Sequence, residues 1–392
     1  MSFSKHNWNK VNLSKICDID PSKKEIASIP NETIVSFAEM ADLNIKKPEF
    51  CHSQEKSIQE LKKNGLSYFK DNDVLLAKMT PCFENGKSGL ANNLKNGVGF
   101  GSTEFFVLRS KGINPYLLYS IISSDLFIEN GKKMMLGTTG RKRLIKDFIA
   151  NFELPLPGDD EQRKLTTLFK SIDASIEQCA VQENKLKVLL KSLANNLLAK
   201  EPLFGNLLNV NNCHSSTMGQ IAECDKKYPE HAVEVTKFVG LEHIEAENFQ
   251  VQGYGNIADG TTFTKKFVAG DILFGKRRAY LKKIAIADFD GVCSNDILVI
   301  RAKGDKILQE LLPFYIASDA FIQVAINTSA GSLSPRTKWK DLSDMEISIP
   351  SIEMQHHVLS VLQQINIIII QIKQQKQTLK NLKQKLLNEI LG

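Results

Sequence analysis

The residues best suited to binding a charged ligand lie in four clusters, two in each half of the chain, where Lys and Arg stand among small polar or aromatic residues. Cationic side chains neutralise phosphates, and hydroxyl or amide groups bond to phosphate oxygens and base edges. We predict DNA contacts from these clusters. For any single lysine among them, the alternative is an ordinary solvated side chain. The predicted contacts are Lys78, Asn85, Lys87, Thr138, Thr139, Arg141, Lys142 and Arg143 in the first half, and Lys276, Arg277, Arg278, Tyr280, Lys282, Ser332, Ser334, Arg336 and Lys338 in the second.

Motifs for catalysis or cofactor binding are missing from the sequence. The glycine-rich stretch at residues 97–101 (GVGFG) lacks the acidic residue about 20 positions later that a dinucleotide fold requires, so it indicates a turn between strands. A phosphate-binding GxxxxGK[ST] loop, an Asn/Asp-Pro-Pro-aromatic motif and cysteine–histidine sets at zinc spacing are also absent. We therefore expect no catalytic, cofactor-binding or metal site. Glu104 and Asp296, which precede apolar strands, are expected to orient nearby basic side chains.

Length and composition predict a multidomain globular protein. A chain of 392 residues is too long for one ordinary core, and 42% hydrophobic with 24% charged residues is typical of globular domains. The net charge of +6 permits a nucleic-acid partner without requiring one. No apolar run is long enough to span a bilayer, and the N-terminal residues lack the apolar core of a signal peptide. We expect a cytoplasmic protein whose seven cysteines are free thiols.

The chain repeats itself in three collinear blocks. Residues 152–165 (FELPLPGDDEQRKL) correspond to the segment that begins at Met345 (MEISIPSIEMQHHVL), and both place a Gln five residues after a Pro. Upstream, DNDVLLAKM corresponds to AGDILFGKR, and GSTEFFVLR corresponds to CSNDILVIR. The order of the blocks is the same in both halves, while the sequences between them differ. This pattern predicts a duplicated scaffold that presents two different surfaces.

Each half ends in a segment whose apolar residues are spaced alternately by four and three positions. Such heptad spacing predicts two long helices that form a coiled coil. Pro157 and Gly158 precede the first helix, and Pro202 and Gly205 follow it. The predicted seam consists of Leu165, Phe169, Ile172, Ile176, Glu183, Leu186 and Leu190 in the first helix, and Val358, Leu362, Ile365, Ile369, Ile372, Lys376 and Leu379 in the second.

Glu183 and Lys376 occupy equivalent positions near the middle of the two seams. If the helices pack antiparallel about a pseudo-two-fold axis, equivalent central positions approach each other. We therefore predict an ion pair between them that sets register and orientation more than net stability. The alternative is that both side chains extend to solvent.

The order of these blocks resembles the specificity subunits of type I restriction–modification systems. The shared pattern is a variable module, a helix opening with PLP and EQ, a second variable module, and a helix opening with SIP and Q. Further matching segments lie at residues 34–42 (IVSFAEMAD), 73–94 and 97–109 of the first half, and at residues 237–244 (KFVGLEHI), 270–296 and 329–342 of the second. The resemblance covers nearly the whole chain.

This resemblance implies an α+β fold with two similar mixed α/β target recognition domains. Each domain is followed by a long helix, and the two helices form an antiparallel coiled coil. Each domain would read one half of a bipartite, asymmetric double-stranded DNA target, and the coil would fix the gap between the halves. The implied partners are two adenine methyltransferase subunits, which carry S-adenosylmethionine, with nuclease–translocase subunits as a further partner class. The chain itself would be non-catalytic.

The repeat and the helix signals place the domain boundaries. We predict a first target recognition domain at residues 1–157, a first helix at 158–201, a linker at 202–214, a second domain at 215–349 and a second helix at 350–392. Two other functions fit the same fold: a stand-alone sequence-specific DNA-binding regulator, and an interaction scaffold without DNA. The target bases do not follow from the sequence, since the side chains that read them lie in the segments that differ between halves.

Overall fold

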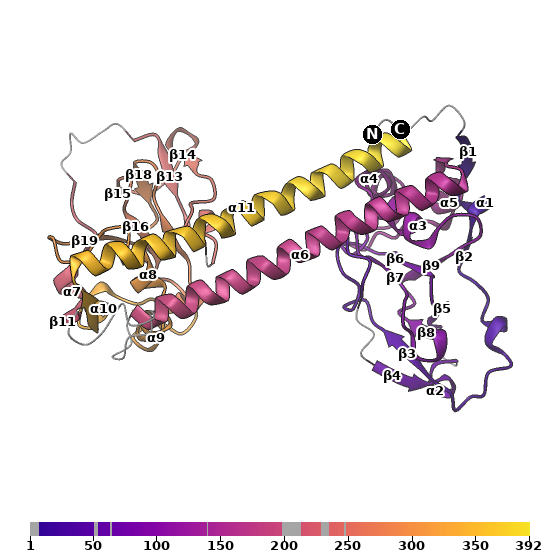
Figure 1. Cartoon of the computed structure of the whole chain (residues 1–392), viewed down its shortest axis with the longest axis horizontal. Coiled ribbons are helices and arrows are strands. Elements are labelled where there is room, and N and C mark those ends of the chain that lie inside the picture. Colours follow the sequence, from indigo (N-terminus) through magenta and orange to yellow (C-terminus); the bar gives the residue numbers. More distant parts are fainter. Residues whose placement is uncertain are drawn as a thin grey trace. The chain divides into compact units, whose positions relative to one another are not determined.

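A computed structural model describes residues 8–50, 54–62, 65–138, 140–197, 213–228, 235–246 and 248–392. The chain divides into two units. The first consists of Met1–Ala180 with Lys373–Gly392, and the second of Val181–Ile372. Each unit therefore combines one module of sheets with a segment of each long helix (Figure 1).

The two modules have the same sheet topology. In the described part of the first, the sheets have the strand orders β1-β10, β2-β9-β6-β7 and β4-β3-β8-β5; in the second they are β11-β20, β12-β19-β16-β17 and β14-β13-β18-β15. Each strand of the second module occupies the place of its counterpart in the first, and β3–β8 and β13–β18 are both parallel pairs. The duplication predicted from three sequence blocks is thus confirmed for the whole topology.

The strands of the first module are β1 (Asn9–Asn12), β2 (Cys17–Ile19), β3 (Ile34–Ala38), β4 (Gln54–Ser57), β5 (Ser67–Lys70), β6 (Val74–Ala77), β7 (Ser88–Leu90), β8 (Val98–Gly101), β9 (Phe105–Ser110) and β10 (Glu153–Leu156). Those of the second are β11 (Cys213–Thr217), β12 (Ala222–Cys224), β13 (Lys237–Val239), β14 (Gly255–Asn256), β15 (Lys265–Phe267), β16 (Ile272–Gly275), β17 (Ile284–Ile286), β18 (Gly291–Cys293), β19 (Ile297–Ala302) and β20 (Glu346–Pro350).

The helices of the first half are α1 (Leu13–Ile16), α2 (Ile58–Lys62), α3 (Pro115–Ile122), α4 (Asp125–Lys133), α5 (Lys146–Asn151) and α6 (Asp159–Leu197). Those of the second are α7 (Met218–Ile221), α8 (Leu312–Ala317), α9 (Asp319–Asn327), α10 (Trp339–Ser343) and α11 (Ile352–Leu391). Short 3-10 turns are η2 (Lys23–Ile26), η3 (Lys95–Gly97), η5 (Leu241–His243), η6 (Ile257–Asp259) and η7 (Ala279–Leu281).

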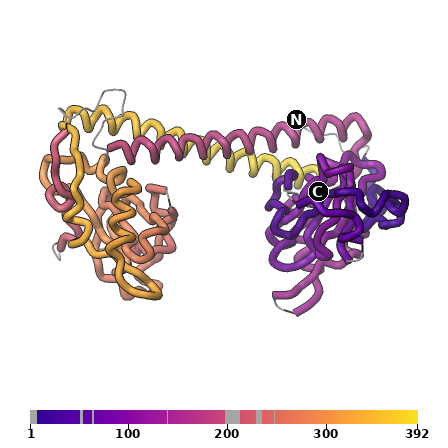
Figure 2. The backbone as a smooth tube through the Cα atoms, turned by 90° about the horizontal axis from the view of Figure 1, so that it is seen from below, coloured from indigo at the N-terminus to yellow at the C-terminus, as the bar shows by residue number. Residues whose placement is uncertain are grey.

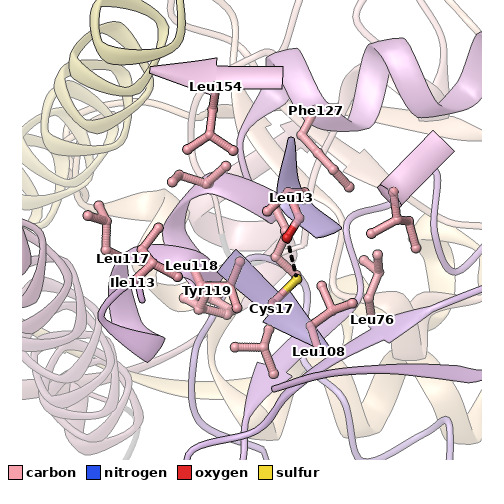
Figure 3. Packing of buried hydrophobic residues seen from close by; sticks show 14 of the residues in the cluster. Leu13, Cys17, Leu76, Leu108, Ile113, Leu117, Leu118, Tyr119, Phe127 and Leu154 are labelled. Carbon is pink, nitrogen blue, oxygen red and sulfur yellow. Dashed lines mark hydrogen bonds between the residues drawn. The ribbon is translucent and has the colours of Figure 1, made fainter. Parts of the chain in front are cut away.

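The central strands β6 and β16 are apolar along their whole length because both of their faces are buried. Successive side chains of a strand point to opposite faces. In β6, Val74 and Leu76 enter the core that also holds the helices, while Leu75 enters a separate core between the two sheets. In β16, Phe274 enters the core that holds the helices of the second module, and Leu273 enters the separate core between its sheets. Figure 3 shows the helix-side core of the first module, where Leu76 and Leu108 lie near Leu13, Cys17, Tyr119 and Phe127.

The two long helices complete both units. The first unit holds the start of α6 and the end of α11, and the second holds the end of α6 and the start of α11, so the pairing within each unit is antiparallel. The predicted first helix ends at residue 201, and residues 198–201 lie outside the described chain. All the predicted seam residues are buried or half-buried on their helices. Leu387 and Ile390 of α11 lie in the first module's core with Phe169 of α6. Figure 2 shows the yellow C-terminal end of α11 beside the indigo and purple first module.

One glutamine at the start of each long helix bonds the helix to its module. The Gln162 side chain accepts from the Asn114 N–H (3.0 Å) and donates to the Gly112 and Pro157 carbonyls (3.3 and 3.1 Å). Gln355 accepts from the Leu308 N–H (2.9 Å) and donates to two carbonyls (2.8 and 2.9 Å) in the same arrangement. Both glutamines are buried. The Pro-to-Gln spacing of the sequence repeat therefore has a structural cause.

Replacing Gln355 with alanine is expected to lower the free energy of unfolding of the second unit by at least about 2 kcal/mol, since each buried polar group left unpaired costs about 1–3 kcal/mol. The change leaves the Leu308 N–H and two carbonyls without the glutamine. Urea unfolding followed by Trp339 fluorescence, in a Trp8→Phe background, measures it in this unit. Gln363→Ala, which alters an exposed glutamine of the same helix, is the control. Equal midpoints for the two variants would contradict the structural role.

A buried charge network lies between the long helices in the first unit. The Lys383 ammonium group of α11 donates to both carboxylate oxygens of Asp173 of α6 (2.7 Å each), and the Tyr116 hydroxyl donates to the same carboxylate (2.7 Å). Burial and this bond raise the pKa of Tyr116. By the 193-residue offset between Gln162 and Gln355, the equivalent residues of the second unit are Leu190 and Asn366, which form no ion pair. The network thus distinguishes the two ends of the helix pair.

The sequence paired Glu183 with Lys376, and these residues fall in different units. Glu183 is buried, and its carboxylate lies 2.9 Å from the ammonium group of Lys187 on the same helix. The Glu183–Lys376 pair stays a prediction.

Candidate nucleic-acid interface

In the first module, the two predicted basic clusters are joined by main-chain hydrogen bonds. The Leu144 N–H donates to the Lys78 carbonyl (2.8 Å), and the Thr80 N–H donates to the Lys142 carbonyl (3.0 Å). The Thr80 hydroxyl accepts from the Lys142 N–H (2.8 Å) and donates to its carbonyl (2.9 Å). The turn after β6 and the segment before α5, far apart in sequence, therefore form one continuous surface.

The second module joins its clusters through the same bonds. The Thr337 N–H donates to the Lys276 carbonyl (3.1 Å), and the Arg278 N–H donates to the Pro335 carbonyl (2.8 Å). Met79 bridges Arg143 in the first module, and Arg277 bridges Arg336 in the second. The two segments thus keep the same backbone arrangement in both modules, although their sequences differ. We call this arrangement the paired-loop surface; it consists of residues 78–87 with 136–144 in the first module and residues 276–283 with 330–338 in the second.

An acidic residue holds one exposed arginine in each paired-loop surface. Arg143 donates from Nε and Nη2 to Glu104 (3.1 and 2.7 Å), and Arg336 donates from the same atoms to Asp296 (2.6 and 3.3 Å). The bond from Arg336 lowers the pKa of Asp296, and the bond to Glu104 raises the pKa of Arg143. Two parallel bonds fix the plane of a guanidinium group, so each arginine presents its remaining N–H groups in a set direction. Glu104 and Asp296 have the expected orienting geometry.

A glycine begins the turn of each hairpin-like loop. Leu136 and Arg143 exchange two main-chain hydrogen bonds (2.9 and 2.8 Å), as do Ala330 and Arg336 (3.0 Å each). Gly137 (φ 131°) and Gly331 (φ 115°) follow in the region that favours glycine. A Cβ on Gly137 would lie 2.6 Å from the Arg141 carbonyl oxygen, so this turn excludes larger residues. The small residues noted in these loops therefore shape the backbone that carries the cations.

Most of the predicted contacts reach solvent on the paired-loop surfaces. The exposed ones are Asn85, Thr138, Arg141, Lys142, Arg143, Arg278, Tyr280, Ser332, Arg336 and Lys338. Lys276, Arg277 and Ser334 are half-buried, and Arg277 donates to the Ser334 hydroxyl (3.1 Å). Thr139 lies outside the described residues.

Three of the predicted lysines have ammonium groups that bond within their own module. Lys78 donates to the Thr103 carbonyl (3.1 Å), and burial lowers its pKa. Lys87 donates to the Met40 carbonyl (3.0 Å). Lys282 donates to Asp319 (2.9 Å) at the start of α9. Each would have to exchange these partners to bind a phosphate. Their assignment as DNA contacts stays a prediction, and no experiment below rests on it.

Sequence reasoning missed Thr80 as a member of the interface. Its hydroxyl fixes the segment that carries Arg141 and Lys142. The signal was weak because Thr80 is an uncharged residue within the first basic cluster and its partner is 62 residues away. Its counterpart Arg278 uses only its backbone for the equivalent bond and adopts a left-handed conformation (φ 54°).

Neither a metal cluster nor a membrane-spanning helix is found in the described part of the chain. No group of three or more His, Cys, Asp or Glu side chains is placed to hold a metal ion within these residues. None of the described helices has the length and apolarity needed to cross a bilayer.

Comparison with known proteins places this duplicated architecture in a family. A family model described as "Type I restriction modification DNA specificity domain" matches residues 5–187 and 220–381, which is most of the chain. The chain belongs to this family. Its two matched regions each cover most of one module and part of the long helix that follows it, so the family model recognises the same duplication as the sheet topology.

Curated relatives within the family are restriction-enzyme subunits. The type I restriction enzyme EcoEI specificity subunit of Escherichia coli is 32% identical over 205 residues, which is 50% of this chain and 34% of the relative. The EcoAI specificity subunit of the same species is 32% identical over 228 residues, 57% of this chain and 36% of the relative. The matched regions therefore span about a third of the length of these relatives.

Solved structures of type I systems share the fold. The type I restriction-modification system S subunit from M. genitalium has a TM-score of 0.57 at 14% identity, covering 100% of this chain and 98% of that one. A chain from a structure described as the basis of complex assembly and conformational transition of a type I system has a TM-score of 0.58 at 17% identity, covering 98% of both. The expected fold class is confirmed: two mixed modules, each followed by a long helix.

Proposed function

We propose that this protein is the non-catalytic DNA specificity subunit of a type I restriction–modification enzyme. In this role it binds a bipartite, asymmetric double-stranded target, one half on each paired-loop surface. The observation that carries the proposal is the recurrence of one surface in both modules: a basic turn after the central strand, bonded to a second basic loop that contains an acid-held arginine.

The electrostatics of these surfaces suit a polyanion. Exposed cations on the first surface include Arg141 and Lys142, and on the second Arg278 and Lys338. Cations of this kind neutralise phosphates and release condensed counterions, which gives affinity without sequence preference. Sequence preference then requires contacts from residues that differ between the two surfaces. A shared backbone arrangement that carries different loop residues is suited to binding two half-targets of different sequence.

The remaining parts of the complex are supplied by other chains. We propose that two adenine methyltransferase subunits bind this chain, carry S-adenosylmethionine and perform the methyl transfer, with nuclease–translocase subunits as a further partner class. Exposed apolar residues on the long helices, among them Val188 and Ile367 in the second unit, are available for such partners. The two long helices set the gap between the half-targets. The complex works in the cytoplasm, where its DNA lies.

A genome-wide map of adenine methylation, made in the host with the gene intact and with it deleted, tests the proposal. The expected result is a methylated motif of two short halves separated by a fixed gap, present with the gene and lost without it. Complementation with the wild-type gene restores the motif, which excludes an effect on a neighbouring gene. A map that is the same in both strains would contradict the specificity role and favour a regulator that binds DNA without methyltransferases.

A further inference from the structure

The second paired-loop surface presents an apolar side chain at its tip. Leu333 is 87% exposed, the largest value for any large hydrophobic residue in the described chain. It lies between Ser332 and Ser334 in the turn that joins Ala330 to Arg336. Single exposed hydrophobic residues are common on protein surfaces, so exposure alone does not give this leucine a role.

The turn that carries Leu333 is held on several sides, so its exposure is not a result of a loosely attached loop. Ala330 and Arg336 close it with two hydrogen bonds (3.0 Å each). Arg277 donates to the Ser334 hydroxyl (3.1 Å), and the Arg278 N–H donates to the Pro335 carbonyl (2.8 Å). A fixed backbone gives a projecting side chain a defined direction, and it lowers the entropy that binding would cost.

The surroundings of Leu333 select the kind of partner. Arg277, Arg336 and Lys338 lie in the same surface, and Asp296 neutralises only part of their charge. A partner of this surface is therefore anionic, but it must also offer an apolar contact at the tip. Double-stranded DNA meets both conditions, because its bases carry thymine methyl groups and apolar faces between phosphate chains.

Comparison of the modules separates shared residues from distinct ones. The bridge, the glycine and the acid-held arginine occur in both surfaces. Leu333 has no apolar counterpart at the same place in the turn, where the first module reads Thr-Thr-Gly-Arg-Lys; the exposed Leu136 of the first surface stands instead at the position of Ala330. Residues common to two readers of different sequences position the DNA, whereas residues that differ between them specify the bases.

We propose that Leu333 reads a base in the half-target of the second module through an apolar contact, either with a thymine methyl group or with the face of an opened base step. The inference rests on the proposed DNA-binding function and adds a specificity-determining residue to it. The contact is apolar, so it contributes to affinity and to base preference without contributing to the salt dependence of binding.

Methylation maps of hosts that carry Leu333→Ala, Ile34→Ala or the wild-type gene provide the first test. Ile34 is an exposed apolar residue of the first module on strand β3, so it is the matched control. Leu333→Ala is expected to broaden the recognised bases at one or two positions of one half, with the other half unchanged. An identical motif in all three hosts would overturn the role of Leu333. If no methylated motif depends on the wild-type gene, the proposed function itself is refuted.

Binding of the purified complex with its methyltransferase subunits to the mapped target gives the second test. Leu333→Ala is expected to raise the Kd about tenfold, the equivalent of one well-placed apolar contact. The salt slope of binding should stay the same, and the thermal unfolding midpoint should not change. A loss of affinity equal on all DNA sequences, or a flatter salt slope, would show a general contact and overturn the proposal.

Modified DNA distinguishes the two forms of contact. Replacing thymine by uracil in the affected half removes one methyl group; for a methyl contact, this weakens the wild-type complex and leaves Leu333→Ala unaffected. For an opened base step, 2-aminopurine at that step becomes more fluorescent on binding of the wild-type complex and not of the variant. If neither substitution separates wild type from variant, Leu333 does not touch a base.

Discussion

Lys383→Met is expected to lower the free energy of unfolding of the first unit by about 3–5 kcal/mol, the usual cost of leaving one charge of a buried pair without its partner. Lys383 is 6% exposed, and its ammonium group donates to both carboxylate oxygens of Asp173. Methionine keeps the length and the apolar stem of the side chain, so the loss reports the charge. In this variant the Tyr116 hydroxyl alone cannot compensate the negative charge of the Asp173 carboxylate.

Trp8 gives a local readout of this change. It is buried in the first unit, and a Trp339→Phe background removes the other tryptophan of the chain. Urea unfolding followed by Trp8 fluorescence measures the effect. Lys47→Met is the matched control, because Lys47 pairs with Glu177 of α6 on the surface (2.7 Å), and exposed pairs contribute about 0–1 kcal/mol.

The double variant Asp173→Leu with Lys383→Met separates charge from packing. Apolar replacement of both partners of a buried pair is often neutral or stabilising, so the double variant should be more stable than Lys383→Met alone. Equal losses in the single and double variants would show that shape, and not an uncompensated charge, dominates at this position.

Removal of three exposed cations from the second paired-loop surface is expected to have the largest effect on function. The triple variant Arg278→Ala, Arg336→Ala, Lys338→Ala should weaken DNA binding about 100-fold at physiological salt and reduce the slope of log K against log salt by about 3, if each cation meets one phosphate. Because phosphate contacts do not depend on sequence, the loss of affinity should be similar on target and non-target DNA. Titrations at several salt concentrations measure both quantities.

The control removes charge from the far end of strand β19. Lys303 and Lys306 are exposed and follow β19 at the end opposite to Asp296, whereas Lys276 follows the end of β16 that pairs with Ile297. Their replacement by alanine should change affinity by less than about threefold, since phosphates near the paired-loop surface lie beyond most of their screened field. An equal loss of affinity per removed charge in the two variants would mean that net charge, and not this surface, drives binding.

The features that the sequence predicted are those that recur. The heptad spacing located the buried stripe of each long helix, and the repeated Pro-to-Gln spacing marked residues that bond each helix to its module. The basic clusters were visible because they occur twice at equivalent points. Periodicity and repetition identify elements and faces, since both reflect constraints that act along the chain.

Pairings between distant residues were beyond the same reasoning. A heptad pattern is unchanged when one helix slides by seven residues, so it does not fix which polar residues meet. The pairing of Glu183 with Lys376 stays a prediction. The buried pair Asp173 with Lys383 in the first unit was not foreseen, because Asp173 lies beside the predicted seam. Likewise, Lys282 could not be separated from neighbouring cations until the fold placed Asp319 against it.

The first unit is completed by residues that are made long after the rest of it. Its core includes Leu387 and Ile390, and the Asp125 N–H at the start of α4 donates to the Gln384 side chain (3.0 Å). The ribosome must add residues 181–372 before this helix segment exists, so the first module waits with an uncovered apolar face while the second is synthesised. A frameshift or nonsense codon near residue 373 would thus damage the first module, although the codons of that module are themselves intact.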